Sequence, residues 1–359
     1  MMDKRWPLML AGSAAALAVV GLGAIWLGAI DVRASTGHWK ITEWVLHGVM
    51  RASVKAAAGE APQPLDPDLV AMGAGHFEQA CLFCHGAPDT PRSALARAML
   101  PPPPDLKEVV ATWRDQDLFE IVQHGVRYSG MPAWPAKGRK DEVWAMVAFL
   151  RAYPDMTGDA YRRMATAPEV AGAVATGDRQ PKADVLARCD ACHAADKLAD
   201  GSFVPQIQGQ NQAYLAASLR AFLSGERESG MMRVAVNGLA PEELDQLAAH
   251  YATLARAPSP GPDRPAPTLS EAGRMLAERG DASRDIPACN SCHGAGSGNP
   301  LFPRLDGLSQ ATIATRLHLF QDKEAQPGGT PYRELMRKAA RKLEERDIKA
   351  LSAYYGSGQ

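Results

Sequence analysis

The chain has 359 residues and a formal net charge of −1, with 39 Lys and Arg against 40 Asp and Glu. This balance leaves no basic footprint for nucleic acid, and a hydrophobic share of 46% indicates a folded protein rather than a disordered one. The length predicts two or three domains, and the 32 Gly and 27 Pro, without long alternating apolar and polar runs, predict helices joined by long loops.

The first predicted element is an apolar helix near the amino terminus. The stretch 8–30 carries no charge and, at about 1.5 Å per residue, is long enough to cross a hydrocarbon core of about 30 Å. A signal peptide is the alternative, because small residues precede Ser35, but the apolar run is longer than a signal peptide needs. We expect a retained anchor, with Lys4 and Arg5 on the cytoplasmic side and the remainder exported.

A second helix is predicted directly after the anchor. Ile41, Val45 and Val49 share one helical face, and two tryptophans stand near the start of the helix. A helix lying at the membrane interface fits this pattern, because Trp is favoured there. The alternative is a connecting helix packed on the first domain.

All six cysteines fall in three copies of Cys-x-x-Cys-His. The copies are Cys81, Cys84 and His85; Cys189, Cys192 and His193; and Cys289, Cys292 and His293. Structural zinc would need pairs to combine into fours, and disulfides would not require a histidine after each pair. In this motif the two thiols can bond to the vinyl groups of one haem, with the imidazole under the iron. The sequence therefore predicts three covalently bound haem c groups on the exported side of the membrane.

An internal repeat suggests further iron ligands. Residues 203–222 align with residues 301–320, and in that register Met232 falls on Met336 whereas Met231 falls on Leu335. A position that accepts leucine needs only bulk. A position that keeps a thioether in both copies favours an iron ligand opposite the histidine, with two matched core methionines as the alternative.

The first motif is followed by a loop, QHGVRYSGMPAW, that presents Met131 between Gly and Pro. We predict Met131 as the corresponding ligand. The competing candidates are Met99, Met146 on an expected core helix, and His124, for which a structural or surface role is favoured.

Three prolines are candidates for supporting the proximal histidines. Pro205 and Pro303 occupy matching sites after their motifs, and Pro104 offers a counterpart in the first segment. A metal-bound imidazole usually donates its other N–H to a carbonyl, and proline holds such a turn rigid. Ordinary loop prolines remain the alternative.

These motifs resemble two kinds of class I cytochrome c. Residues 170–359, from CDACH to LSAYY, resemble the tandem two-haem cytochromes of the c-four type, and CLFCHGAP through DEVWAMVAFLRAYP, with the membrane helix, resembles membrane-anchored single-haem cytochromes of respiratory gene clusters. The resemblance implies helical lobes, His/Met ligation and electron transfer. It also implies that the histidines and methionines named above are iron ligands, and that the prolines named above offer their carbonyls to those histidines. Two departures are Ala194, where the family has glycine, and a short polar run before Cys189, which predicts a reduced first helix.

The expected fold is all-α, with three class I cytochrome c lobes in tandem behind one transmembrane helix. The expected divisions are 1–34 for the cytoplasmic tip and anchor, 35–65 for the juxtamembrane helix and linker, 66–157 for the first domain, 168–256 for the second and 268–359 for the third. Linkers are expected within 153–183 and 255–270, where the composition changes.

The expected function is single-electron transfer on the periplasmic face of a bacterial inner membrane. The partner would be a haem–copper oxidase, or a periplasmic dehydrogenase for which this chain is the cytochrome subunit. The alternative is an enzyme resembling di-haem peroxidases, with one open haem position, but the matched Met232 and Met336 argue against it. We expect no catalytic residue.

Overall fold

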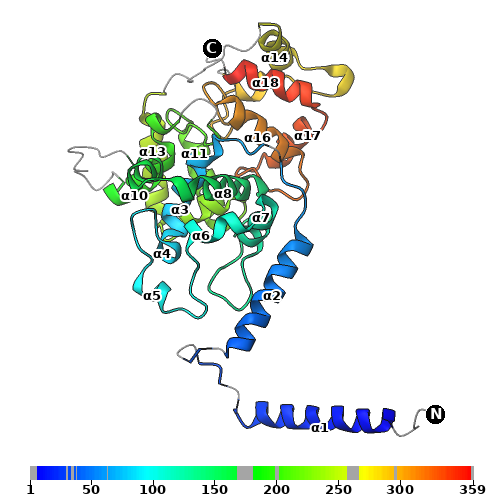
Figure 1. The fold of residues 1–359 in the computed structure, drawn as a ribbon. Helices are drawn as coiled ribbons and strands as arrows, with labels where there is room; N and C mark the ends of the chain where they lie inside the picture. Colours follow the sequence, from blue (N-terminus) through cyan, green and yellow to red (C-terminus); the bar gives the residue numbers. More distant parts are fainter. Residues whose placement is uncertain are drawn as a thin grey trace.

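The chain folds into helices joined by loops. The computed structural model describes residues 6–29, 31–33, 36–37, 39–62, 64–167, 181–198, 202–256, 267–294 and 297–356. Within these residues the regular structure is helical, with two isolated β-bridges and no strand (Figure 1). The all-α expectation is confirmed. Lys4, Arg5 and Ser35 lie outside the described residues, as do residues 168–180 of the first expected linker and residues 257–266 of the second.

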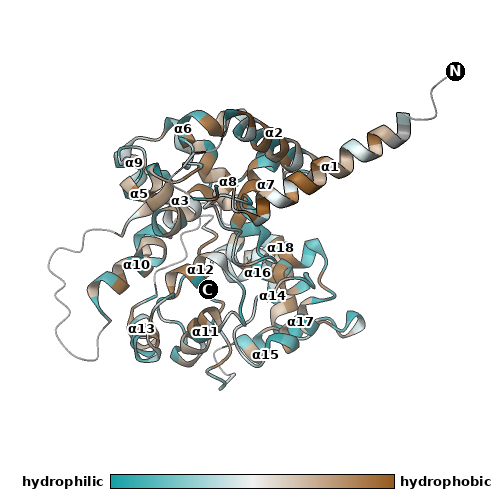
Figure 2. Cartoon of the chain, turned by 90° about the horizontal axis from the view of Figure 1, so that it is seen from below, coloured by the Kyte–Doolittle hydropathy of each residue, from teal (hydrophilic) through white to brown (hydrophobic). Residues whose placement is uncertain are grey.

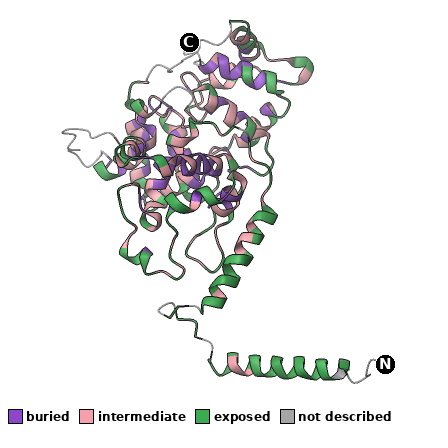
Figure 3. Cartoon of the chain, in the orientation of Figure 1, coloured by how far each residue is buried: buried purple, intermediate pink, exposed green. Residues whose placement is uncertain are grey.

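Helix α1 (Trp6–Trp26) lies apart from the rest of the molecule, and its side chains are mostly apolar and exposed (Figures 2 and 3). It is the single candidate membrane span in the described part of the chain. Helix α2 (Lys40–Ala57) connects it to the first lobe. The end of α2 packs on that lobe, with the Arg51 guanidinium 4.3 Å above the Trp113 ring, whereas Trp44 near its start is exposed.

The first lobe is built on the crossing of α3 and α8. A Cβ at Gly73 would collide with the Ala145 carbonyl and Phe149 Cβ, so the missing side chain allows the close approach. Phe77 lies 4.9 Å from Phe149 between ring centroids, at the centre of the core. The helices of this lobe are α3 (Leu69–Ala80), α4 (Leu82–His85), α5 (Ala94–Arg97), α6 (Leu106–Val109), α7 (Asp115–His124), α8 (Lys140–Ala152) and α9 (Gly158–Ala165).

Helix α9 lies in a segment that was expected to be a linker. Tyr161 and Ala165 belong to the first core, and the Tyr161 hydroxyl donates to the Glu78 carboxylate at 2.6 Å. The core of the first lobe therefore extends beyond residue 157. A helix of 8 residues shows too little periodicity to be recognised in a polar sequence.

The second and third lobes have separate cores of their own. In the third lobe α14 crosses α18 at Gly273, again with no room for a Cβ. In the second lobe α10 has only residues 183–188 ahead of its motif, as the short polar run predicted, and it lies against α3 of the first lobe. The remaining helices are α10 (Ala183–His193), α11 (Gln212–Ser224), α12 (Gly230–Ala235), α13 (Pro241–Thr253), α14 (Pro267–Arg279), α15 (Asn290–His293), α16 (Gln310–Gln321), α17 (Arg333–Ala340) and α18 (Glu345–Gly356).

Substituting Gly73→Ala should destabilise the first lobe by about 1–3 kcal/mol, because a methyl group must push α3 away from α8. Hydrogen exchange of the α3 and α8 amides measures this loss. Gly48→Ala is the matched control, since a Cβ there meets nothing within 4 Å and alanine favours a helix. Equal protection in the two variants would contradict the tight crossing.

Candidate haem sites

One cavity lies between the second and third cores and is lined by both of their motifs. Its volume is about 390 Å³, and its lining is largely apolar. The motif and methionine residues that line it are Cys189, Cys192, His193, Met232, Cys289, Cys292, His293 and Met336. The second and third motifs, which the internal repeat aligns with each other, therefore face the same cavity.

In the second lobe the histidine of the motif ends α10 and points one ring nitrogen at a carbonyl. His193 Nδ1 lies 3.0 Å from Pro205 O. Because a carbonyl only accepts, Nδ1 carries the proton and the Nε2 lone pair is left for iron. Burial lowers the pKa of His193, which keeps the ring neutral as an iron ligand must be.

The third lobe repeats this geometry. His293 Nδ1 lies 2.8 Å from Pro303 O. Burial lowers the pKa of His293, and the Pro303 carbonyl partly opposes that shift. The repeat extends to a tyrosine in the last helix of each lobe. Tyr251 donates to Asp190 at 2.7 Å, and Tyr355 donates to the matching Asn290 at 2.7 Å.

The two adjacent methionines point to different lobes. Met232 packs against the second core, and its repeat partner Met336 packs against the third. Met231 packs against the core of the first lobe, whereas Leu335 is 51% exposed. Met231 therefore fills an interface between lobes, a role that has no counterpart in the third lobe.

The first motif has a different setting. His85 ends α4, and its buried Nδ1 has no hydrogen-bond partner among the described residues. Burial lowers the pKa of His85, and the nearby Pro104 carbonyl partly opposes that shift. The carbonyl does not form a hydrogen bond with Nδ1 like those of the other two lobes. Met131 is half-buried in the loop after α7 and does not line the shared cavity.

The competing candidates of the first lobe occupy distinct positions. The Met99 side chain lies against Gly130, next to the Met131 loop. Met146 is buried in the first core, as expected of a core residue. The His124 side chain is 66% exposed, with Nε2 3.5 Å from the Glu120 carboxylate.

The first thiol of each pair lies in surroundings that disfavour its ionised form. Burial raises the pKa of Cys81 and Cys189 to about 12, and that of Cys289 to about 11. No group of three or more His, Cys, Asp or Glu in the described ranges could hold a metal ion.

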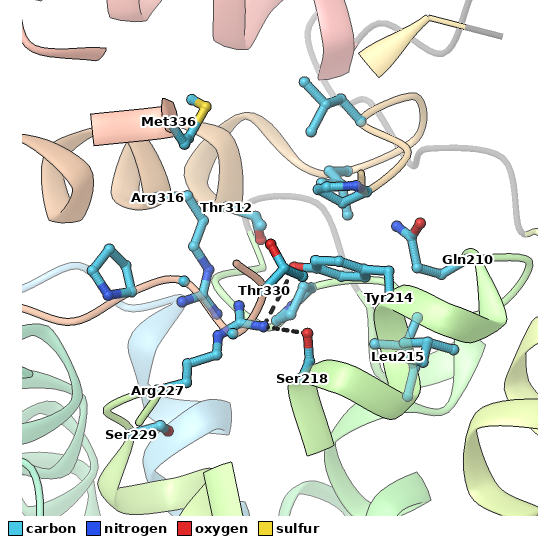
Figure 4. A pocket seen from close by; sticks show the side chains of 18 of the residues that line it. Gln210, Tyr214, Leu215, Ser218, Arg227, Ser229, Thr312, Arg316, Thr330 and Met336 are labelled. Carbon is cyan, nitrogen blue, oxygen red and sulfur yellow. Dashed lines mark hydrogen bonds between the residues drawn. The ribbon is translucent and has the colours of Figure 1, made fainter. Parts of the chain in front are cut away.

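Arg227 and Arg316 face the shared cavity, and neither has a carboxylate partner among the described residues (Figure 4). Arg227 Nη1 is held by Ser218 Oγ at 2.8 Å, but Arg227 Nε and Arg316 Nη1 are buried without hydrogen bonds among the described residues. Burial lowers the pKa of Arg316 to about 9, and the nearby Arg227 adds to that shift. Buried cations of this kind need an anion.

The residues present fit haem c. Haem carboxylates would pair with Arg227 and Arg316, the rings of one haem at each motif would fill the apolar cavity, and the thiols and imidazoles would hold each macrocycle and its iron. Bound haem supplies a one-electron iron centre. The sequence did not lead us to predict these arginines. In the repeat, Arg316 of the third lobe aligns with Ser218 of the second, and this difference could have indicated a special role for Arg316.

Comparisons with known proteins find sequences that are similar to parts of this chain. Residues 68–150 match the family described as cytochrome c oxidase, cbb3-type, subunit III. The chain is 34% identical over 139 residues to a thiosulfate dehydrogenase electron acceptor of Thiomonas intermedia, covering 38% of this chain and 64% of that protein. It is 31% identical over 192 residues to cytochrome c4 of Stutzerimonas stutzeri, covering 50% and 89%. The crystal structure of reduced cytochrome c4 from Pseudomonas stutzeri aligns with a TM-score of 0.43 and 28% identity, covering 50% and 98%.

Substituting Arg316→Gln should lower the reduction potential of haem bound in the shared cavity. The reason is that a nearby cation favours the reduced iron, which is less positive than the oxidised iron. The reduced haem should lose electrostatic stabilisation on the order of 1 kcal/mol. A spectroscopic redox titration measures it. Arg346→Gln, at a side chain that is 72% exposed, is the control and should leave the potentials unchanged. Equal shifts in both variants would contradict the role of the buried cation.

Proposed function

Because the chain belongs to the cytochrome c family, we propose that it is a membrane-anchored carrier of three haem c groups, passing single electrons along the periplasmic face of a bacterial inner membrane. The chain is an electron-transfer protein, and its cofactor is covalently bound haem c. The observation that carries the proposal is the cavity in which two complete motifs and their matched methionines meet. The relatives support a carrier rather than the peroxidase-like enzyme.

The proposed ligand sets follow the repeat and the Met131 loop. The irons would be held by His85 and Met131, by His193 and Met232, and by His293 and Met336. Proline carbonyls at 3.0 and 2.8 Å from Nδ1 support the second and third sets, with Pro104 as the counterpart in the first. Six-coordinate irons leave no position for a substrate, which suits a protein that only relays electrons.

The proposed domain division follows the three cores. The first lobe would run from residue 66 to the end of α9, the second over 168–256 and the third over 268–359. Each core is small for an independent domain, and a buried macrocycle would enlarge it. Covalent attachment at each motif would thus stabilise its lobe as well as supply the redox centre.

The redox partners are proposed from the names of the relatives. A periplasmic dehydrogenase is supported as the donor, because one relative is a thiosulfate dehydrogenase electron acceptor. A haem–copper oxidase is supported as the acceptor, because residues 68–150 match a cbb3-type oxidase subunit family. His/Met ligation favours the relatively high potentials that such a route needs.

The membrane attachment is proposed from the first two helices. Helix α1 is apolar and exposed on all sides, as a helix in lipid would be. Trp39 and Trp44, at the exposed start of α2, are placed to lie in the interface above it. The end of α2 would then hold the first lobe close to the membrane.

The function predicts how the natural chain behaves in cells. The full chain should stay in the membrane fraction, and a pyridine haemochrome assay should return about three haems per chain, one for each motif. Changing both cysteines of one motif to alanine should lower the count by one. A mature terminus at Ser35 would overturn the anchor, and two haems in the unaltered chain would overturn the proposed count.

Substituting Met232→Ala should remove one contribution to the methionine-to-iron charge-transfer band of the oxidised protein, because the thioether is its source. Met231→Leu should leave the band intact, since Met231 packs against the first core and leucine stands at the matching place in the third lobe. Absorption spectra of the two variants measure this. The opposite pattern would overturn the assigned ligand.

A further inference from the structure

A buried carboxylate of the first lobe meets the helix that carries Met232. Glu142 stands in the first turn of α8 and is 2% exposed. Its side chain points out of its own lobe, toward the start of α12 in the second lobe. The segments in contact are 88 residues apart in sequence, so only the docking of the two lobes brings them together.

The carboxylate accepts hydrogen bonds from the first residues of α12. The Gly230 amide donates to Glu142 Oε2 at 2.6 Å, and the Met231 amide lies 3.4 Å from the same oxygen. Ser229 Oγ donates to Oε1 and accepts from the Met232 amide at 3.0 Å. The backbone of the proposed ligand is therefore joined to Glu142 through one serine hydroxyl.

Groups of the first lobe fix the carboxylate in this position. Arg139 Nη1 lies 2.8 Å from Glu142 Oε1, and Trp134 Nε1 donates to Oε2 at 3.3 Å. Asp141 holds the same guanidinium at 2.9 and 2.7 Å. The hydrogen-bond and ion-pair partners of Glu142 among the described residues are all donors, so a rotation of its side chain would leave several buried polar groups unpaired.

The two lobes touch closely around these bonds. A Cβ at Gly230 would collide with the Trp134 indole, and a Cβ at Gly75 of α3 would lie 2.5 Å from Cys192 Sγ. His76 of the first lobe also lines the shared cavity. The first lobe thus forms part of the wall of the second site, and a shift of α12 relative to that wall would move Met232 relative to His193.

The third lobe lacks this arrangement. In the repeat register Arg333 stands in the place of Ser229, and the Met336 amide donates to the Tyr332 carbonyl at 3.1 Å within its own helix. No carboxylate of another lobe is hydrogen-bonded to the described start of α17. The contact is therefore a feature of the second site and not of the repeated unit.

We propose that Glu142 is a positioning residue that the first lobe supplies to the second haem site, holding Met232 at the iron and so setting the reduction potential of that haem. The inference rests on the proposed function, because it requires Met232 to be a ligand. Its consequence is that docking of the first lobe and the potential of the second site are coupled.

The test uses the sign of the potential change. Removing a negative charge near a haem raises its potential, whereas loosening a methionine ligand lowers it. In the full chain, Glu142→Ala should weaken the part of the charge-transfer band that Met232→Ala abolishes. It should also lower the reduction potential of that haem. A tenfold fall in the ratio of reduced to oxidised protein at a fixed applied potential corresponds to a shift of about 59 mV for one electron. Glu142→Gln keeps the shape but replaces one accepting oxygen by an NH2 group, so it should weaken the same band to a smaller extent.

Asp117→Asn is the matched control. Asp117 is a buried carboxylate that accepts from the Arg114 amide at 3.0 Å at the start of α7, within the first lobe. Its loss should weaken that lobe and leave the second haem unchanged. A raised potential with an intact band in Glu142→Ala would overturn the inference, as would an equal effect of Asp117→Asn. If Met232→Ala leaves the band intact, the proposed ligand fails and this inference fails with it.

Discussion

The second and third lobes are arranged around a space that their own side chains do not fill. Protein interiors are normally close-packed, so a cavity of about 390 Å³ lined by Cys, His and Met indicates the place of a large cofactor. The separate cores, the buried thiols and the histidines turned toward proline carbonyls all take their positions around it. Haem c meets this requirement because it is apolar in its ring and anionic at one edge.

The second constraint is that a buried charged group needs a partner of opposite charge. Two places in the molecule satisfy this need in different ways. Arg227 and Arg316 face the cavity with no carboxylate partner in the described part of the chain, so a bound anion would stabilise them. Glu142 and Arg139 are paired with each other between the first and second lobes. Such a pair holds one geometry closely, because each partner would be costly if left alone. This makes the junction suited to fixing the start of α12.

Much of the fold could be predicted from the sequence, because helices and short motifs depend on local spacing. The all-α class was predicted correctly, as was the short first helix of the second lobe. Helix α9 was missed because its apolar residues are few and four apart, and they become recognisable only against Phe77 of the first core. Met99 shows a similar limit, since only the fold brings its side chain against Gly130, the residue before Met131.

The sequence by itself determined the sites of haem attachment, because two thiols and a histidine within one helical turn need no distant partner to be recognised. It also separated Met232 from Met231, through the register of the repeat. Only the tertiary structure decided that Met231 packs on the first lobe, that Arg316 faces Arg227, and that Glu142 reaches α12. The physical reason is that these contacts join segments about ninety residues apart, and no local periodicity reports which surfaces will dock.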